Sequence, residues 1–292
     1  MFAAAGGFLI WGLVPIYWKQ LQSVSALELI AHRIVWSLFL LLAVLAGQKK
    51  LREVRPAFTS GRRIGLNLLS SVLLTTNWTV YVWAVNSGHI LETSLGYFLT
   101  PLGNVLFGYL FLHERLRKLQ WTAVALATAG VSFLLFGVGH VPWIALTLAG
   151  TWSSYALLKK KSALGPVAGL TVETLLLFPL AAAMLLWWWH AGTGALGRVD
   201  ALHHGLILSV GVVTAVPLVL FAYGAQRIRL VTLGVLQYLA PTAQFLIGLL
   251  VYRETFDGNR FQAYALIWGG LVLYTVDSIR AQGRPPGRRD PA

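Results

Sequence analysis

Charged residues and cysteine are what this sequence lacks most clearly. Of its 292 residues, 11% are charged, whereas soluble proteins average about 25%. Hydrophobic residues make up 57%, and a water-soluble fold of this size could not bury so much apolar surface. The absence of cysteine excludes disulfides, thiol catalysis and thiolate metal ligands. Together these features predict an integral membrane protein with no room for a soluble catalytic domain.

Acidic residues are scarcer than basic ones, because 10 Asp and Glu accompany 23 Lys and Arg to give a formal net charge of +13. In a soluble protein this excess would suggest a nucleic-acid partner. Here the basic residues lie mostly between apolar runs, where they indicate topology instead. We therefore expect no nucleic-acid binding.

Motifs for catalysis, metal binding and nucleotide binding are also missing. The sequence has no Ser/His/Asp arrangement in a supporting context, no HExxH motif and no phosphate-binding loop. A G-x-G-x-x-G string at 192–197 follows an apolar run rather than a strand, so we discount it. The sequence thus predicts no catalytic residue, no metal, no cofactor and no ATP-driven pumping by this chain alone.

Ten apolar runs fill the chain, and helices that cross a bilayer need about 20 such residues. The runs lie at 2–18, 24–47, 64–87, 91–112, 119–139, 141–158, 166–190, 204–224, 230–252 and 259–280. They are continuous rather than alternating, which favours helices over the strands of a membrane barrel. The predicted fold class is an all-α integral membrane protein with ten transmembrane helices, the first of them an uncleaved helix rather than a signal peptide.

The distribution of Lys and Arg predicts the orientation. Most of these residues lie in the connections on the side that would hold both termini. The opposite side holds Lys19, Arg198, Arg253 and Arg260. The positive-inside rule then places both termini in the cytoplasm, with 282–292 as a cytoplasmic tail. The expected location is the cell (cytoplasmic) membrane.

The second half of the sequence echoes the first. In one register, Pro101 aligns with Pro241 and Glu114 with Glu254. The predicted domains are one repeat at 1–140 and another at 141–281, each with five helices. Because five is odd, the second repeat would enter the membrane inverted relative to the first, an arrangement typical of secondary transporters. The alternative is a duplication kept only for helix packing.

Several short strings along the chain are distinctive: FLIWG at 8–12, PIYWK at 15–19, ELIAHRIVWS at 28–37, NW at 77–78, WAVN at 83–86, SLGYF at 94–98, VET at 172–174, TLG at 232–234 and QY at 237–238. These strings resemble the RarD subfamily of the EamA transporters, within the drug/metabolite transporter superfamily. The resemblance covers essentially the whole chain and implies ten helices in two inverted EamA repeats. It also implies a permease role, which in the family is associated with sensitivity or resistance to chloramphenicol. Family members usually carry a polar stretch before the first helix, whereas this chain begins almost inside it.

Polar and aromatic residues inside the apolar runs share helical faces, and such groups turn away from lipid toward cavities or other helices. The predicted pocket-lining residues are Trp11, Asn77, Tyr81, Tyr97, Asn104, Trp152, Tyr155, Phe221, Gln237 and Gln244. Pro101 and Pro241 are predicted helix kinks. An aromatic lining with a few amides suits a small amphipathic molecule. The alternative is that these residues only join helices.

Ionisable residues inside the runs are candidates for coupling. Glu28 and His32 lie four residues apart on one helical face, and Glu173 aligns with Glu28 in the second half. One hypothesis is that they carry a coupling proton. The other is structural, with Glu28 and Arg33 as paired anchors near the membrane surface. Glu114 and Glu254 are expected to form salt bridges.

The function predicted from these features is secondary-active transport by alternating access, exporting small metabolites or amphipathic drugs. The expected partners are a small-molecule substrate, membrane lipid, and a coupling proton or an exchanged solute; no oligomeric state is predicted. A channel, a membrane enzyme and a structural membrane protein are the alternatives. A channel would show no counterflow, and an enzyme would need a clustered acid–base pair, which the sequence does not display.

Overall fold

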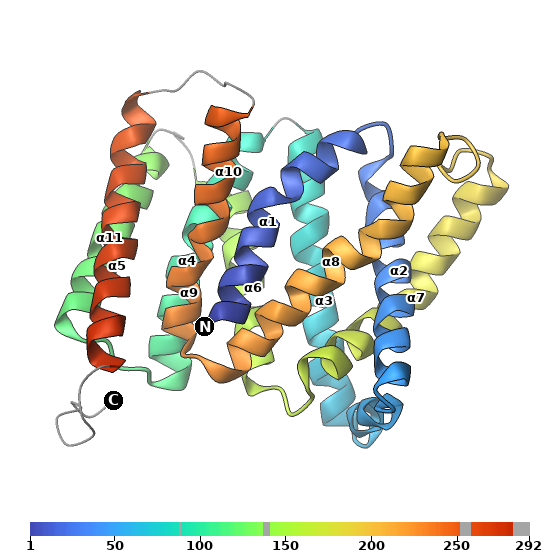
Figure 1. Ribbon diagram of the computed structural model, residues 1–292, viewed down its shortest axis with the longest axis horizontal. Helices are drawn as coiled ribbons and strands as arrows, with labels where there is room; N and C mark the ends of the chain where they lie inside the picture. The colour runs from blue at the N-terminus through green and yellow to red at the C-terminus, as the bar shows by residue number, and fades with distance from the viewer. Residues whose placement is uncertain (88, 137–140, 252–257, 283–292) are drawn as a thin grey trace.

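The computed structural model describes residues 1–87, 89–136, 141–251 and 258–282, and within these ranges the chain forms helices and no strand (Figure 1). The first half contains α1 (Phe2–Gln20), α2 (Ala26–Gly47), the 3-10 helix η1 (Leu51–Phe58), α3 (Gly61–Asn86), α4 (Ile90–Leu112) and α5 (Lys118–Phe136). The second half contains α6 (Trp143–Lys161), α7 (Pro166–His190), α8 (Ala201–Arg227), α9 (Leu230–Gln237), α10 (Leu239–Leu250) and α11 (Gly258–Gln282).

Local signals explain several helix starts. The Ser25 hydroxyl accepts a hydrogen bond from the backbone N–H of Glu28 and caps α2. Asp200 caps α8 in the same way, accepting the N–H of His203 at 2.8 Å. Proline at the first position of α7, Pro166, supplies a backbone angle suited to a helix start.

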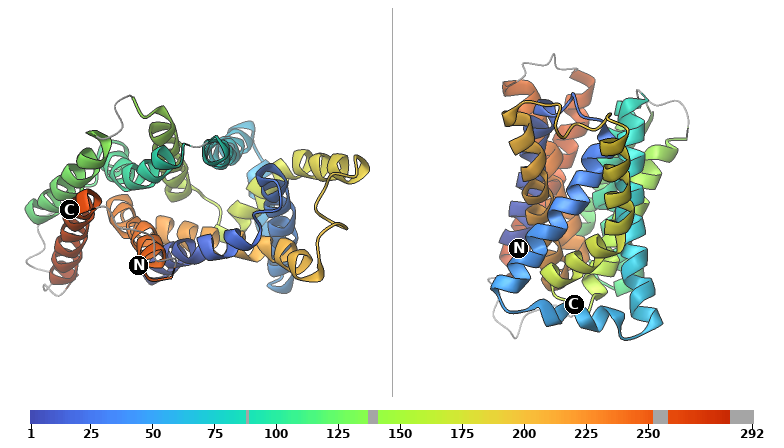
Figure 2. Two further views of the ribbon diagram at one scale, coloured as in Figure 1. Left: turned by 90° about the horizontal axis from the view of Figure 1, so that it is seen from above. Right: turned by 90° about the vertical axis from the view of Figure 1, so that its right-hand side faces the viewer.

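The helices form one elongated bundle (Figures 1 and 2). The α1–α2 and α7–α8 connections lie at its upper end in Figure 1, and the α2–α3 and α6–α7 connections lie at its lower end. At one edge α5 packs against α11, and toward the other edge α2 packs against both α7 and α8. Between these edges α1 packs on α8 and α10, and α4 packs on α6 and α9.

Each apolar run of the sequence overlaps a helix, but the ninth run is divided. α9 ends at Gln237 and α10 begins at Leu239. A proline clashes with the carbonyl four residues earlier and offers it no N–H, and for Pro241 that carbonyl belongs to Gln237. Pro101 has no such effect, because α4 continues through it from Ile90 to Leu112.

The outer surface of the bundle is apolar. Large hydrophobic side chains that are exposed on it include Phe39, Leu110, Phe133, Leu186 and Val272. Exposed apolar area on this scale marks a surface that contacts a membrane or another protein. Among the described residues, five helices are long and apolar enough to cross a bilayer: α1, α2, α4, α7 and α8.

Glycines allow close helix contacts at two points that matter for the site. A Cβ added at Gly224 of α8 would lie 2.6 Å from the Cβ of Ala4 in α1. A Cβ added at Gly234 of α9 would lie 2.6 Å from the carbonyl oxygen of Pro101 in α4. Neither position can therefore accept a side chain without moving a helix apart from its neighbour.

The lower half of the bundle centre is filled by a packed layer, defined by Phe8, Tyr155, Phe221, Leu230 and Leu233. These side chains come from α1, α6, α8 and α9, and each is at most 1% exposed. The rings of Tyr155 and Phe221 stack at 6.1 Å between centroids. The layer closes the centre of the bundle below the cavity described next.

Candidate substrate cavity

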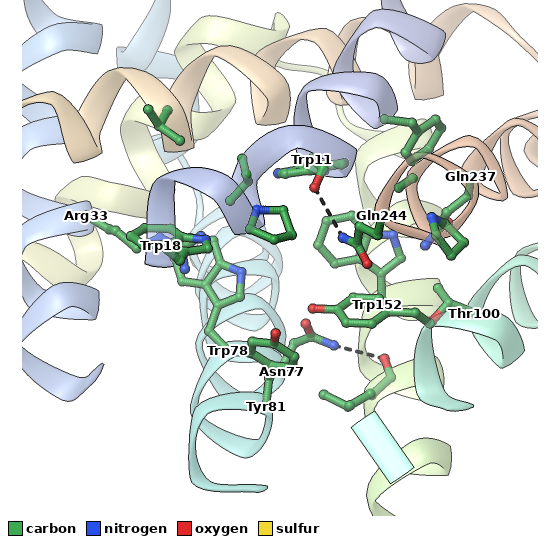
Figure 3. Close-up of a pocket in the computed structure, with 18 residues that line it drawn as sticks. Trp11, Trp18, Arg33, Asn77, Trp78, Tyr81, Thr100, Trp152, Gln237 and Gln244 are labelled. Carbon is green, nitrogen blue, oxygen red and sulfur yellow. Dashed lines mark hydrogen bonds between the residues drawn. The ribbon is translucent and has the colours of Figure 1, made fainter. Parts of the chain in front are cut away.

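A cavity lies between helices of the two halves of the chain, above the packed layer (Figure 3). It holds about 1040 Å³ of space between atoms, part of it continuous with the outside. Its lining comes from α1, α2, α3 and α4 of the first half and from α6, α8, α9 and α10 of the second.

Most residues that the sequence suggested for a pocket do lie in the wall of this cavity. These are Trp11, Asn77, Tyr81, Tyr97, Trp152, Gln237 and Gln244, together with Pro241. They come from six different helices, and Figure 3 shows the labelled members around one space. The pattern of shared helical faces therefore pointed to residues that the fold brings together.

The other suggested residues lie outside the lining. Tyr155 and Phe221 belong to the packed layer, where both are 0% exposed. Asn104 is buried behind Gln237 and donates from its Nδ2 to Gln237 Oε1 at 2.8 Å. Pro101 contacts α9 at Gly234 instead. Spacing along one helix identified the faces that point into the bundle. It did not predict how far along each face the cavity extends before packed side chains replace it.

Aromatic rings dominate the cavity wall. Tyr81 and Tyr97 meet edge to face with ring centroids 5.5 Å apart, and Trp11 and Trp152 do the same at 5.3 Å. Tyr97 is 37% exposed, although its helix lies inside the bundle, because its side chain faces the cavity. The Nε1 of Trp152 is buried and has no hydrogen-bond partner among the described residues. The wall can therefore hold an apolar or aromatic body on its faces.

Amide side chains in the wall are oriented by hydrogen bonds. Asn77 donates from Nδ2 to the Leu148 carbonyl and to Thr151 Oγ1, both at 2.9 Å. Gln244 donates from Nε2 to the carbonyl of Trp11 at 3.2 Å. Because the amide nitrogens make these bonds, the amide oxygens of Asn77 and Gln244 are left as acceptors at the cavity.

Among the lining residues that were not proposed from the sequence, three lie together: Arg33, Trp18 and Trp78. The Cζ of Arg33 lies 4.0 Å from the Trp78 ring centroid and 5.3 Å from the Trp18 centroid. Arg33 Nε donates to Thr214 Oγ1 at 3.0 Å. A signal for it existed, because an arginine inside an apolar run rarely faces lipid.

The suggested pairing of Glu28 with Arg33 is wrong. Glu28 Oε1 accepts the backbone N–H of Ala195 at 2.6 Å and lies 3.7 Å from His32 Nε2. Both side chains of this Glu28–His32 pair are buried, and neither lines the cavity. Glu28 therefore ties α2 to the α7–α8 connection, at the upper end of the bundle.

Glu173, the third coupling candidate, lies in an ion pair at the lower end. Lys159 Nζ is 2.6 Å from Glu173 Oε1, and the side chains are 3% and 1% exposed. The Tyr155 hydroxyl donates to Glu173 Oε2 at 3.1 Å. The predicted apolar run ends at residue 158, but α6 continues to Lys161, so Lys159 lies in its last turn.

Glu114 lies just beyond the end of α4 and caps a different helix. Its carboxylate accepts the backbone N–H groups of Leu230 and Val231 at 2.7 and 2.9 Å, at the start of α9. Arg229 Nε is 4.0 Å away, so the expected salt bridge is at most a long one. A carboxylate at a helix start also complements the helix dipole. Glu254, its partner in the sequence alignment of the halves, lies outside the described residues.

Comparison with known proteins agrees with the arrangement of helices and with the strings noted in the sequence. Residues 1–136 match the EamA-like transporter family. A protein named "Uncharacterized transporter" from Vibrio cholerae serotype O1 is 41% identical over 278 residues, covering 95% of this chain and 92% of that protein. "Protein RarD" from Streptomyces exfoliatus is 39% identical over 287 residues, covering 98% and 91%.

A solved crystal structure, one of several that match, shares the fold, with a TM-score of 0.72 over 96% of this chain and 97% of that chain, at 19% sequence identity. The resemblance first seen in short strings is confirmed by the relatives of about 40% identity that cover most of the chain. The chain therefore belongs to the RarD subfamily of the EamA-like transporter family and is a multi-pass membrane protein.

Proposed function

We propose that this protein is a secondary-active permease of the cell membrane that exports small metabolites or amphipathic drugs by alternating access. The observation that carries the proposal is the aromatic cavity between the two halves of the chain. Membership in a transporter family supports a small-molecule substrate. The amide acceptors and ring faces of the wall favour a molecule with an apolar body and a few polar groups.

The packing of the helices supports two inverted repeats, at 1–140 and 141–281, as the basis of the mechanism. Helices of the same rank in each half contact one another: α2 packs on α7, α4 on α9, and α5 on α11. The cross-contacts come in matching pairs, since α1 packs on α8 and α3 on α6. Such pairing is what a two-fold axis in the membrane plane would produce, and exchanging the conformations of the halves would move the opening to the other side.

The two ends of the bundle centre differ as alternating access requires. The cavity occupies the upper part, and the packed layer of Phe8, Tyr155, Phe221, Leu230 and Leu233 lies below it. A second cavity, lined by Arg63, Asn67 and Lys159 among others, lies at the lower end. The lower end carries most of the basic residues of the chain, so the positive-inside rule makes it the cytoplasmic end. In this assignment the protein is open toward the outside and both termini are cytoplasmic.

A counterflow experiment in proteoliposomes tests the proposal. Vesicles loaded with a panel of unlabelled amino acids, nucleobases or chloramphenicol would be offered trace labelled solute, with and without a pH gradient. Transient accumulation that saturates and is stimulated by internal solute is expected for at least one compound. A flux without saturation or counterflow would instead identify a channel, and no flux for any compound would favour a membrane enzyme or a structural protein.

A topology experiment tests the inverted repeat separately. Reporter tags placed at residue 140 and at residue 292 should report opposite sides of the membrane, because five helices separate each end of a repeat. Signals from the same compartment would remove the inverted arrangement and the alternating-access mechanism with it.

A further inference from the structure

The cavity contains one formally charged side chain, Arg33, and no acidic one. Arg33 lies in α2, is half-buried and belongs to the cavity lining, beside Trp18 and Trp78 (Figure 3). No carboxylate of the described residues lies within 4.0 Å of it. Two acids on α2 and α7, which pack together, are engaged elsewhere: Glu28 with the Ala195 backbone and Glu173 with Lys159.

The neighbours of Arg33 stabilise the charge without neutralising it. Trp78 and Trp18 place ring faces within 5.3 Å of its Cζ, an interaction worth up to about 2 kcal/mol when water is excluded. Thr214 accepts only the Nε–H. A guanidinium has five N–H donors, so its two terminal nitrogens keep their donors for a partner in the cavity.

We propose that Arg33 binds an anionic oxygen group, a carboxylate or a phosphate, of an organic substrate whose apolar or aromatic body lies against the rings of the wall. This inference rests on the proposed function and adds the substrate class to it. The planar fork of a guanidinium fits both oxygens of a carboxylate or phosphate. The wall opposite, with Trp11 and Trp152, then receives the body of the molecule.

A binding experiment on the purified full-length protein in neutral detergent tests the inference without requiring transport. The probes share one ring and differ in charge: phenylacetate, phenylacetamide, phenethylamine and phenyl phosphate. Binding is measured from thermal stabilisation across a concentration series. We expect at least one of the two anions to bind at least about tenfold more tightly than the amide and the amine, as a hydrogen-bonded charge pair would give. Equal binding of all four, a preference for the amine, or no binding of either anion would overturn the proposal.

Variants locate the effect. Arg33→Gln should remove the preference for the anion, whereas Arg227→Gln, at an exposed arginine on α8, should keep it. A preference that survives in Arg33→Gln would also overturn the proposal. The anion that binds more tightly, phenylacetate or phenyl phosphate, distinguishes a carboxylate substrate from a phosphate ester.

If Arg33→Gln does not fold, chemical modification of arginine in the wild-type protein tests whether Arg33 binds the anion. Phenylglyoxal should modify Arg33, the tighter-binding anion should protect it at least about fivefold in mass spectra, and modification of Arg227 should be unaffected. Equal modification of Arg33 with and without the anion would count against the site. An anion preference without any counterflow would leave this inference standing while the transport proposal fails.

Discussion

Two basic side chains inside the bundle, Lys159 in the lower half and Arg33 in the upper half, are stabilised in different ways. In the lower half Lys159 forms a buried ion pair with Glu173, supported by Tyr155. In the upper half Arg33 borders the cavity, with ring faces and a threonine as partners but no carboxylate of the described residues. Lys159 is therefore fully occupied within the fold, whereas Arg33 retains donors for a ligand.

The comparison distinguishes a charged side chain that stabilises the fold, Lys159, from one that is available to a ligand, Arg33. A buried pair contributes little when intact but strongly destabilises the fold when one partner is removed. A cation beside a water-reachable cavity is tolerated without a fixed partner, because solvent or substrate can reach it. The predictions below test this contrast, beginning with the largest expected effect.

Breaking the Lys159–Glu173 pair should have the largest effect on stability. Lys159→Met leaves the Glu173 carboxylate buried without its cation, and we expect a loss of about 3–5 kcal/mol in the free energy of unfolding in detergent. Lys161→Met, at the exposed end of the same helix, is the matched control and should change it little. The double variant Lys159→Met, Glu173→Leu should recover part of the loss; an additive loss would contradict the ion-pair explanation.

Filling a close helix contact in the lower half should be the next largest effect. Gly224→Leu pushes a side chain against Ala4 of α1 and should cost about 1–3 kcal/mol of stability. Gly205→Leu is the control on the same helix, because nothing lies within 4 Å of a Cβ added there. Equal thermal unfolding of the two variants would show that α1 and α8 do not pack as described.

Cavity substitutions should reduce transport while leaving the abundance of the protein in the membrane intact. Tyr97→Ala and Gln237→Ala each remove a lining group and should lower the counterflow rate by about three- to tenfold, the range expected for a lost aromatic or polar contact. Tyr109→Ala, at an exposed tyrosine of the same helix as Tyr97, should keep both transport and abundance. Normal transport in both cavity variants would remove the assignment of the cavity as the substrate site.

The smallest effect is expected at Glu28. Glu28→Gln keeps an oxygen acceptor for the Ala195 N–H, so stability should fall by only about 1 kcal/mol. Because Glu28 and His32 lie outside the cavity lining, pH-driven accumulation should stay within about twofold of wild type. Abolished accumulation with normal abundance would instead make Glu28 the carrier of a coupling proton.

The presence of the helices could be predicted from the sequence, because a long apolar run in a bilayer can satisfy its backbone hydrogen bonds only as a helix or in a closed barrel. Some of the residues that line the cavity could also be predicted, since Tyr97 and Gln237 fall on polar helix faces that repeat between the halves. Tyr155 and Phe221 show the limit of that reasoning. They share faces with lining residues, yet they lie in the packed layer, because the distance between helices decides whether a face borders space or protein.

The ionisable residues were the hardest to interpret from the sequence. Glu28 and Arg33 were suggested as paired anchors near the membrane surface, but five positions apart their side chains leave α2 in different directions. Glu28 instead meets the backbone of Ala195, distant in the sequence. Lys159 lies just beyond the predicted apolar run at 141–158, and its partner Glu173 lies on the following helix. Contacts between helices depend on how the helices pack, and the periodicity of residues along one helix does not predict that packing.

The sequence by itself determined that this chain enters a membrane as many helices and that it belongs with the RarD proteins. Hydropathy and short sequence strings are properties of neighbouring residues in the chain, so both can be recognised without a structure. Only the tertiary structure decided which basic side chain is neutralised and which remains free. That outcome depends on the packing of α2 against α7 and α8, and of α6 against its neighbours, which together set the distances between charges remote in the chain.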